Sequence, residues 1–141
     1  MPIELTSLRK AVEALERSLL TARESPGLDN LEPSVREAVK AGVIKHFEVA
    51  YEQSWKFMQR WLRENAAPNE AEYPRTRKDL FRMAARYGLI SDPEPWFVFA
   101  DARNISTHTY DEYRADEVYL VAGSFLPHVS ELLDNLKKIN D

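Results

Sequence analysis

Apolar side chains that recur every three or four residues are the feature that most restricts the fold of this chain. Residues 4–23 carry one such series: Leu5, Leu8, Val12, Leu15 and Leu19. This spacing places an apolar stripe along one side of an α-helix, whereas a half-buried strand would alternate every second residue. No segment of the sequence shows that alternation, so we predict an all-α fold.

The longest predicted helix begins near Pro33, after a loop at residues 25–33 that contains proline and glycine. Its apolar positions again step by three and four: Val43, Ile44, Phe47, Tyr51, Trp55, Met58 and Leu62. The three aromatic rings of this stripe could stack on nucleobases. A helix core or a dimer interface is the more common use of such a stripe, and we expect the rings there.

A short third helix is predicted at residues 76–87, after a polar linker at residues 65–74. Thr76 can cap its first turn, and Gly88 is a favourable residue just past its end. A fourth helix should begin at Asp92-Pro93, because aspartate is a good N-cap and proline suits the first helical position.

The last predicted helix covers residues 111–138. Gly123 and Pro127 fall inside it, so we expect a kink or break there. Four or five amphipathic helices with short connections are typical of an antiparallel up-and-down bundle, and we predict that architecture for a single domain at residues 1–141.

The composition narrows the possible chemistry and location. The chain has 44% hydrophobic residues, 30% charged residues and no cysteine. A chain without cysteine has no disulfide, no thiolate metal ligand and no cysteine nucleophile. No apolar run is long enough to span a membrane, and residues 1–4 lack the features of a signal peptide. We therefore expect a cytoplasmic protein with no membrane partner.

The charged residues are unevenly distributed, although the net charge is only −4. Residues 74–87 hold five basic side chains and one acid, whereas residues 88–136 hold nine acids and two arginines. Four of the basic residues are spaced by three and four, and therefore predict one stripe: Arg75, Lys78, Arg82 and Arg86. Such a stripe could bind the phosphates of RNA, or it could be a solvated face paired with acids elsewhere.

Several familiar kinds of active site lack support. His46, His108 and His128 do not have the spacing of metal ligands, and we expect neither a metal nor a cofactor. The sequence contains no glycine-rich phosphate loop and no nucleophile-elbow motif. We expect His46 on a helix surface and His128 at a polar position beside the predicted break.

The richest concentration of reactive side chains lies at residues 103–110, which read Arg-Asn-Ile-Ser-Thr-His-Thr-Tyr. The imidazole of His108 can accept and donate protons near neutral pH, and the guanidinium of Arg103 can hold a phosphate. That combination suits metal-free RNA cleavage. Five residues correspond to about 140° around a continuous helix, so the two side chains converge only if the helix ends or distorts, or if a second subunit contributes.

This stretch resembles the Arg-x4-His signature of the HEPN superfamily, here extended to Arg-x4-His-x-Tyr. Residues 101–110 are similar to those of its HepT subgroup, also known as nucleotidyltransferase substrate-binding proteins. Other parts of the chain resemble the same subgroup in the same order: Phe47-Glu48-x-x-Tyr51-Glu52-x-x-Trp55-Lys56, Phe81-Arg-x-Ala-x-x-x-Gly88-Leu89-Ile90, and Pro127 after Phe125-Leu126. The resemblance covers nearly the whole chain.

The resemblance implies an α-helical homodimer in which two Arg-x4-His motifs meet in a cleft. It implies a metal-independent endoribonuclease that is the toxin of a type VII toxin–antitoxin pair. Arg103 and His108 would be catalytic, and Asn104 would be a polar neighbour in the cleft. The implied partner is a minimal nucleotidyltransferase antitoxin that transfers AMP onto Tyr110.

Two other functions stay open at this stage. The chain could be a non-catalytic subunit that binds a nucleotide or another substrate for a two-component nucleotidyltransferase. It could also be a helical dimer without any site, in which case substitutions at Arg103, His108 and Tyr110 would change neither toxicity nor partner binding.

Overall fold

The computed structural model describes residues 3–24, 27–71, 74–108 and 112–139, without side-chain detail at 70–71, 107–108 and 112–113. All regular elements within these ranges are helical, as the apolar spacing predicted. The long helices are α1 (Thr6–Arg23), α2 (Pro33–Asn65), α4 (Arg77–Arg86), α5 (Glu94–His108) and α6 (Glu112–Ile139). Two short elements join them: the 3₁₀ turn η1 (Leu28–Asn30) and the single turn α3 (Pro68–Ala71). We predicted that residues 65–74 form a linker. They do so only in part, because α3 lies within this segment.

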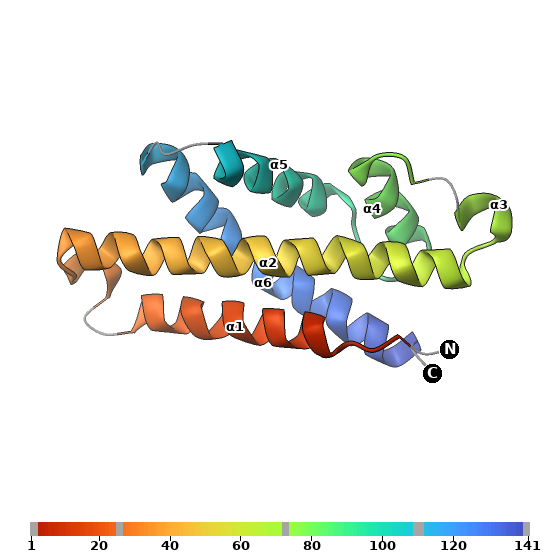
Figure 1. The fold of residues 1–141 in the computed structure, drawn as a ribbon, viewed down its shortest axis with the longest axis horizontal. Helices are drawn as coiled ribbons and strands as arrows, with labels where there is room; N and C mark the ends of the chain where they lie inside the picture. Colours follow the sequence, from red (N-terminus) through yellow and green to blue (C-terminus); the bar gives the residue numbers. More distant parts are fainter. Residues whose placement is uncertain (1–2, 25–26, 72–73, 109–111, 140–141) are drawn as a thin grey trace.

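Helix α2 is the axis around which the other helices are arranged (Figure 1). Helix α1 runs beside it, α4 and α5 lie along another side, and α6 crosses behind it. Helix α6 also contacts α1 and α5, which closes the bundle. The helices of the described part of the chain include none with the length and apolarity of a bilayer span.

A cluster of aromatic rings from α2, α4, α5 and α6 lies within the hydrophobic core. Phe125 lies at its centre, with ring centroids 4.9 Å from Phe99, 5.2 Å from Phe47 and 5.4 Å from Trp96. These pairs meet edge to face, the arrangement that the quadrupoles of aromatic rings favour. Phe47 and Tyr51 are buried, which confirms that these two rings of the aromatic stripe serve the core.

The helix ends follow the local signals in the sequence. The Thr76 hydroxyl accepts a hydrogen bond from the Asp79 amide at 3.1 Å, which caps α4 as predicted. Gly88, just past α4, has a φ of 82°, a conformation that glycine adopts without strain. The Asp92 carboxylate accepts a hydrogen bond from the Glu94 amide at 3.0 Å, and α5 begins at Glu94, one residue later than predicted.

We predicted a kink or a break at Pro127, and the break is excluded because α6 continues through this residue. Proline lacks the N–H that would bond to the carbonyl of Gly123. Phe125 and Val129, on either side of the proline, are completely buried. Their packing against the core holds both halves of α6, while the proline itself lies on the exposed side.

Candidate active site

Arg103 is held on the surface of α2 by two glutamates. Its Nη1 lies 3.0 Å from Glu48 Oε2, and its Nε lies 3.5 Å from Glu52 Oε1. The two acids are four residues apart on α2, so they project from the same side of that helix. The arginine side chain keeps 25% of its surface exposed, although its Nε atom is buried.

Ser106 extends this contact by one turn of α5. Its hydroxyl lies 2.9 Å from Glu48 Oε2 and 2.8 Å from the backbone carbonyl of Arg103. Position 106 meets Glu48, whereas Arg103 meets both Glu48 and Glu52, so α5 runs antiparallel to α2 here. The end of α5 that carries His108 is thereby anchored against the middle of α2.

Trp55 lies on the same side of α2 as the two glutamates that hold Arg103, and Arg77 packs against it. The indole Nε1 of Trp55 donates to Glu52 Oε2 at 3.1 Å. The guanidinium carbon of Arg77 lies 3.5 Å from the centroid of the Trp55 ring, a close cation–π contact. One carboxylate and one indole therefore connect Arg103 on α5 to Arg77 at the start of α4.

The hydroxyl of the buried Tyr51 lies close enough to Arg77 and Arg103 to feel their charges, and it stays protonated. Burial raises the pKa of Tyr51 to about 12, and the negative charge of Glu52 acts in the same direction. The positive charges of Arg77 and Arg103 oppose the pKa shift without cancelling it. The Tyr51 side chain is therefore uncharged near neutral pH, and it does not act there as a base.

Helix α5 continues without interruption from Arg103 to His108. The two residues therefore lie about 140° apart around its axis, and the possibility that the helix ends between them is excluded. The side chain of His108 lies outside the described residues, and so does Tyr110 as a whole. Asn104 is exposed on α5 beside Arg103, where a ligand can reach it.

The predicted basic stripe on the third helix is only partly present. Arg75 precedes α4 and therefore does not share its helical face, whereas Lys78, Arg82 and Arg86 do. All four side chains are exposed. Lys78 and Arg82 lie over the Phe97 ring of α5, at 5.5 Å and 5.3 Å from its centroid. Arg82 also pairs with Asp79 at 3.3 Å.

The other two histidines contribute to packing. His46 is half-buried against α1 rather than fully on the surface, and it lines a shallow groove with Arg17 and Ser18. The His128 ring lies 5.3 Å from that of Phe99. Within the described residues, no three His, Cys, Asp or Glu side chains gather closely enough to bind a metal ion.

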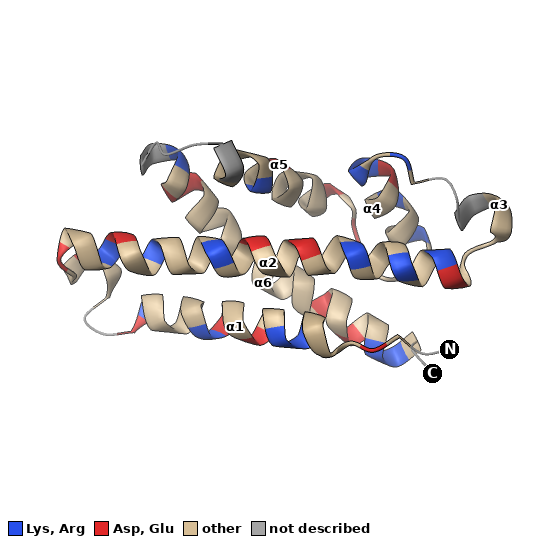
Figure 2. Cartoon of the chain, viewed as in Figure 1, with Lys and Arg blue, Asp and Glu red and all other residues tan. Residues whose placement is uncertain are grey.

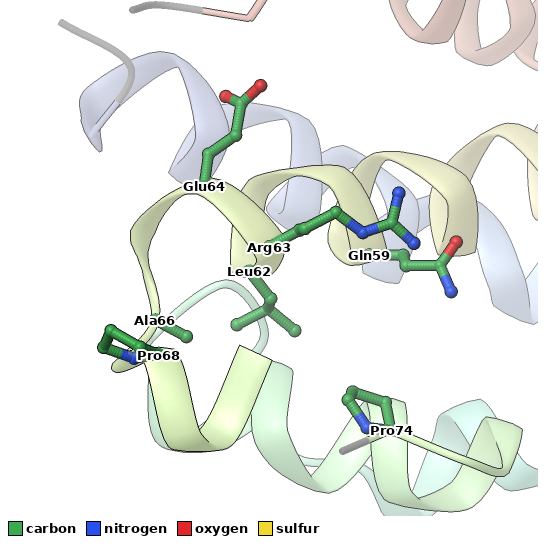
Figure 3. A pocket seen from close by; sticks show the side chains of 7 residues that line it. All are labelled: Gln59, Leu62, Arg63, Glu64, Ala66, Pro68 and Pro74. Carbon is green, nitrogen blue, oxygen red and sulfur yellow. The ribbon is translucent and has the colours of Figure 1, made fainter. Parts of the chain in front are cut away.

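A hollow of about 680 Å³ lies further along α2, towards its C-terminal end (Figure 3). Gln59 and Arg63 extend from α2 on the same side, with Pro74 across the hollow, while Glu64 points away (Figure 3). The spacing of residues 55, 59 and 63 places Gln59 and Arg63 on the same side of α2 as Trp55.

The sequence indicated Arg103 as a candidate site residue but did not indicate the residues that hold it. Glu48 and Glu52 have the spacing of one helical face, yet only the packing of α5 on α2 shows which cation they meet. Arg77 belongs to the basic segment but not to the stripe of four, and its contact with Trp55 comes from a helix distant in sequence.

Comparisons with known proteins agree with this fold. Residues 3–138 match the family model described as nucleotidyltransferase substrate binding protein like. A Haemophilus influenzae protein named probable ribonuclease HepT is 35% identical over 138 residues, which cover 98% of this chain and 94% of the relative. A solved Haemophilus influenzae structure, described as revealing the fold of a substrate binding domain of a nucleotidyltransferase, has a TM-score of 0.87 at 35% identity. It covers 95% of this chain and 99% of its own.

Proposed function

Because this chain belongs to the nucleotidyltransferase substrate binding protein-like family, we propose that it is a HepT-like endoribonuclease that works without a metal ion. The observation that carries the proposal is the placement of Arg103. Its guanidinium is fixed by Glu48 and Glu52, and its side chain is partly exposed. His108 follows Arg103 by five residues on the same helix. The name of the Haemophilus influenzae relative, probable ribonuclease HepT, supports the same activity.

The active form in this proposal is a homodimer. On the continuous α5, Arg103 and His108 lie on different sides of one helix. A second copy can bring its own α5 beside the first, so that Arg103 of one subunit and His108 of the other approach the same phosphate. The cleft between the two α5 helices would then hold the RNA.

The reaction that these residues suit is transesterification of the RNA backbone. The 2′-oxygen bonds to the adjacent phosphorus, and the bond from phosphorus to the 5′-oxygen of the next nucleotide breaks. His108 accepts the proton of the 2′-hydroxyl or donates one to the departing oxygen. Arg103 stabilises the extra negative charge on the phosphorane. The products are a 2′,3′-cyclic phosphate and a free 5′-hydroxyl, and no water is consumed.

Cleavage in EDTA tests this activity. We expect the protein to cut single-stranded RNA, and Arg103→Ala or His108→Ala to lower the rate by about 10²- to 10³-fold. Arg82→Ala is the matched control, because Arg82 is exposed and its ion pair in the described structure is with Asp79 of the same helix. The absence of cleavage by the wild type, or equal cleavage by His108→Ala, would contradict the proposal.

A nucleotidyltransferase antitoxin is the proposed partner, and Tyr110 is the proposed site of AMP transfer. Tyr110 follows His108 by two residues. Bulky, negatively charged AMP groups there would obstruct RNA and repel its phosphates. Intact mass after co-expression with such an enzyme should rise by whole AMP units, and Tyr110→Phe should remove the increase. An unchanged wild-type mass would exclude this mode of control with that partner.

A non-catalytic role as a nucleotide- or substrate-binding subunit is the second candidate. It is favoured by the two carboxylates that already neutralise Arg103, and by the description of the solved relative as a substrate binding domain. Nucleotide binding that survives both Arg103→Ala and His108→Ala, in a protein without nuclease activity, would support this role over the first.

A further inference from the structure

One side of α2 joins Arg103 to two more arginines. Its members recur at three- and four-residue steps, and we call them the α2 track: Glu48, Glu52, Trp55, Gln59 and Arg63. At 1.5 Å per residue the track is about 22 Å long. Arg103 lies over its first two members, Arg77 lies over Trp55, and the hollow of Figure 3 opens beside Gln59 and Arg63.

The charges along the α2 track change from net negative around Arg103 to positive towards Arg63. Glu48 and Glu52 both pair with Arg103. Within the described residues, no carboxylate lies within ion-pair distance of Arg77 or Arg63. Glu64, the acid nearest to Arg63 in sequence, is among the residues that line the hollow, but its side chain extends away from those of Gln59 and Arg63 (Figure 3). Its carboxylate pairs with Arg60 at 3.8 Å. Both arginines of this half of the track therefore have charge available for an anion.

The side chain of Arg77 is also held in place before any ligand binds. It is the first residue of α4, where the helix dipole disfavours a cation, so the helix does not account for an arginine at this point. Its planar guanidinium instead lies against the Trp55 ring, and the indole is fixed in turn by Glu52. An arginine held against a ring in this way loses less side-chain entropy when its N–H groups bind phosphate oxygens.

We propose that the α2 track is a binding site for the phosphate backbone of single-stranded RNA, with Arg77 and Arg63 as its phosphate-binding residues. The strand would leave the scissile phosphate at Arg103, pass over Arg77 and enter the hollow at Arg63. This inference rests on the proposed ribonuclease function and extends it. It assigns the main backbone contacts to these two arginines and not to the exposed stripe of α4.

Binding of an RNA that cannot be cut tests the α2 track separately from catalysis. The probe is a labelled twelve-nucleotide oligouridylate with 2′-O-methyl groups, which lacks the attacking hydroxyl. Affinity is measured by fluorescence anisotropy over a range of salt concentrations. Each phosphate contact with a single strand contributes about 0.7 to the slope of log affinity against log salt. Arg77→Gln and Arg63→Gln should each weaken binding several-fold and lower the slope by about that amount.

Two matched substitutions control for the general loss of positive charge. Arg82→Gln is on α4 with Arg77, and Arg60→Gln is on α2 with Arg63; their side chains are 58% and 56% exposed and pair with local acids. Neither substitution should change the slope. If all four variants bind alike, if no slope changes, or if the wild type fails to bind the probe, the inference is overturned.

The remaining outcomes separate this inference from the proposed activity. A wild type that binds the probe through Arg77 and Arg63 but cuts no natural RNA would contradict the nuclease and still support the track. If Arg77→Gln and Arg63→Gln lose binding to a protein partner but keep their affinity for RNA, the inference is overturned. Thermal melting shows whether Arg77→Gln is folded. Arg63 is exposed and stacks on no ring in the described structure, so Arg63→Gln alone can decide if Arg77→Gln unfolds.

Discussion

Arg77 and Arg82 lie five residues apart on α4 and have very different surroundings. Arg77 lies against the Trp55 ring of α2 at 3.5 Å. Arg82 is 58% exposed, with Asp79 and the Phe97 ring as its neighbours. Arg103 on α5 resembles Arg77, since it too is held against α2. The surface of α2 therefore separates the basic residues into a held pair, Arg77 and Arg103, and an exposed set, Lys78, Arg82 and Arg86.

Figure 2 shows where the charged residues lie along α2 and α4. Acidic and basic positions both occur along α2, so a cation that packs there meets carboxylates as well as rings (Figure 2). On α4, Lys78 and Arg82 are exposed, with the Phe97 ring of α5 beside them. The difference shows that a run of basic residues in a sequence does not identify which of them have fixed positions.

Glu48→Ala should have the largest effect on the held pair. It removes one partner of Arg103 and one of the two acceptors near the Ser106 hydroxyl, and it leaves a partly buried guanidinium less compensated. We expect the free energy of unfolding to fall by about 2 kcal/mol, as measured by chemical denaturation. Glu13→Ala, which breaks an exposed pair with Arg9, is the control and should cost about 0.5 kcal/mol or less. Equal losses for the two variants would show that Arg103 is not held by its acids.

Trp55→Leu should have the next largest effect. It removes the ring on which Arg77 lies and the indole N–H that donates to Glu52. We expect a loss of about 1 kcal/mol in unfolding free energy, because a cation–π contact and one hydrogen bond disappear while much of the apolar volume stays. In the Arg77→Leu background the same substitution should cost less. A cost that is unchanged there would mean that Arg77 and Trp55 are not coupled.

Tyr51→Phe should alter the pH dependence of stability at alkaline pH. The folded-state pKa of about 12 lies above the ordinary value of 10, so the stability from the protonated hydroxyl is present below pH 10. It is lost as pH rises from 10 to 12. The free energy of unfolding of the wild type should therefore fall relative to that of Tyr51→Phe over this interval. Parallel curves for the two proteins would show that the hydroxyl is not buried beneath the held pair.

Arg82→Gln should have the smallest effect. Its pair with Asp79 is exposed on both sides and spans only three residues of one helix. We expect a change within about 0.5 kcal/mol in either direction by the same denaturation measurement. A loss comparable to that of Trp55→Leu would place Arg82 with the held pair and remove the distinction between the two groups.

Much of the fold follows from local patterns that need no partner segment. Leu8, Leu15 and Leu19 specify the buried side of α1, and Thr76 and Gly88 specify the ends of α4. These signals act within a few residues, which is why spacing and turn chemistry predict them. The absence of a break at Pro127 has a tertiary cause, because burial of Phe125 and Val129 keeps α6 continuous where local propensity favours a break.

The candidate site divides in the same way. The sequence alone determined that Arg103 and His108 would lie in one helical region rich in reactive groups, because their order and spacing are covalent facts. Only the tertiary structure decided what Arg103 meets. Glu48 and Glu52 come from α2, more than fifty residues earlier, and Trp55 meets Arg77 across a second helix pair. Such contacts depend on how the helices pack around their shared core, and spacing within any one helix does not encode them.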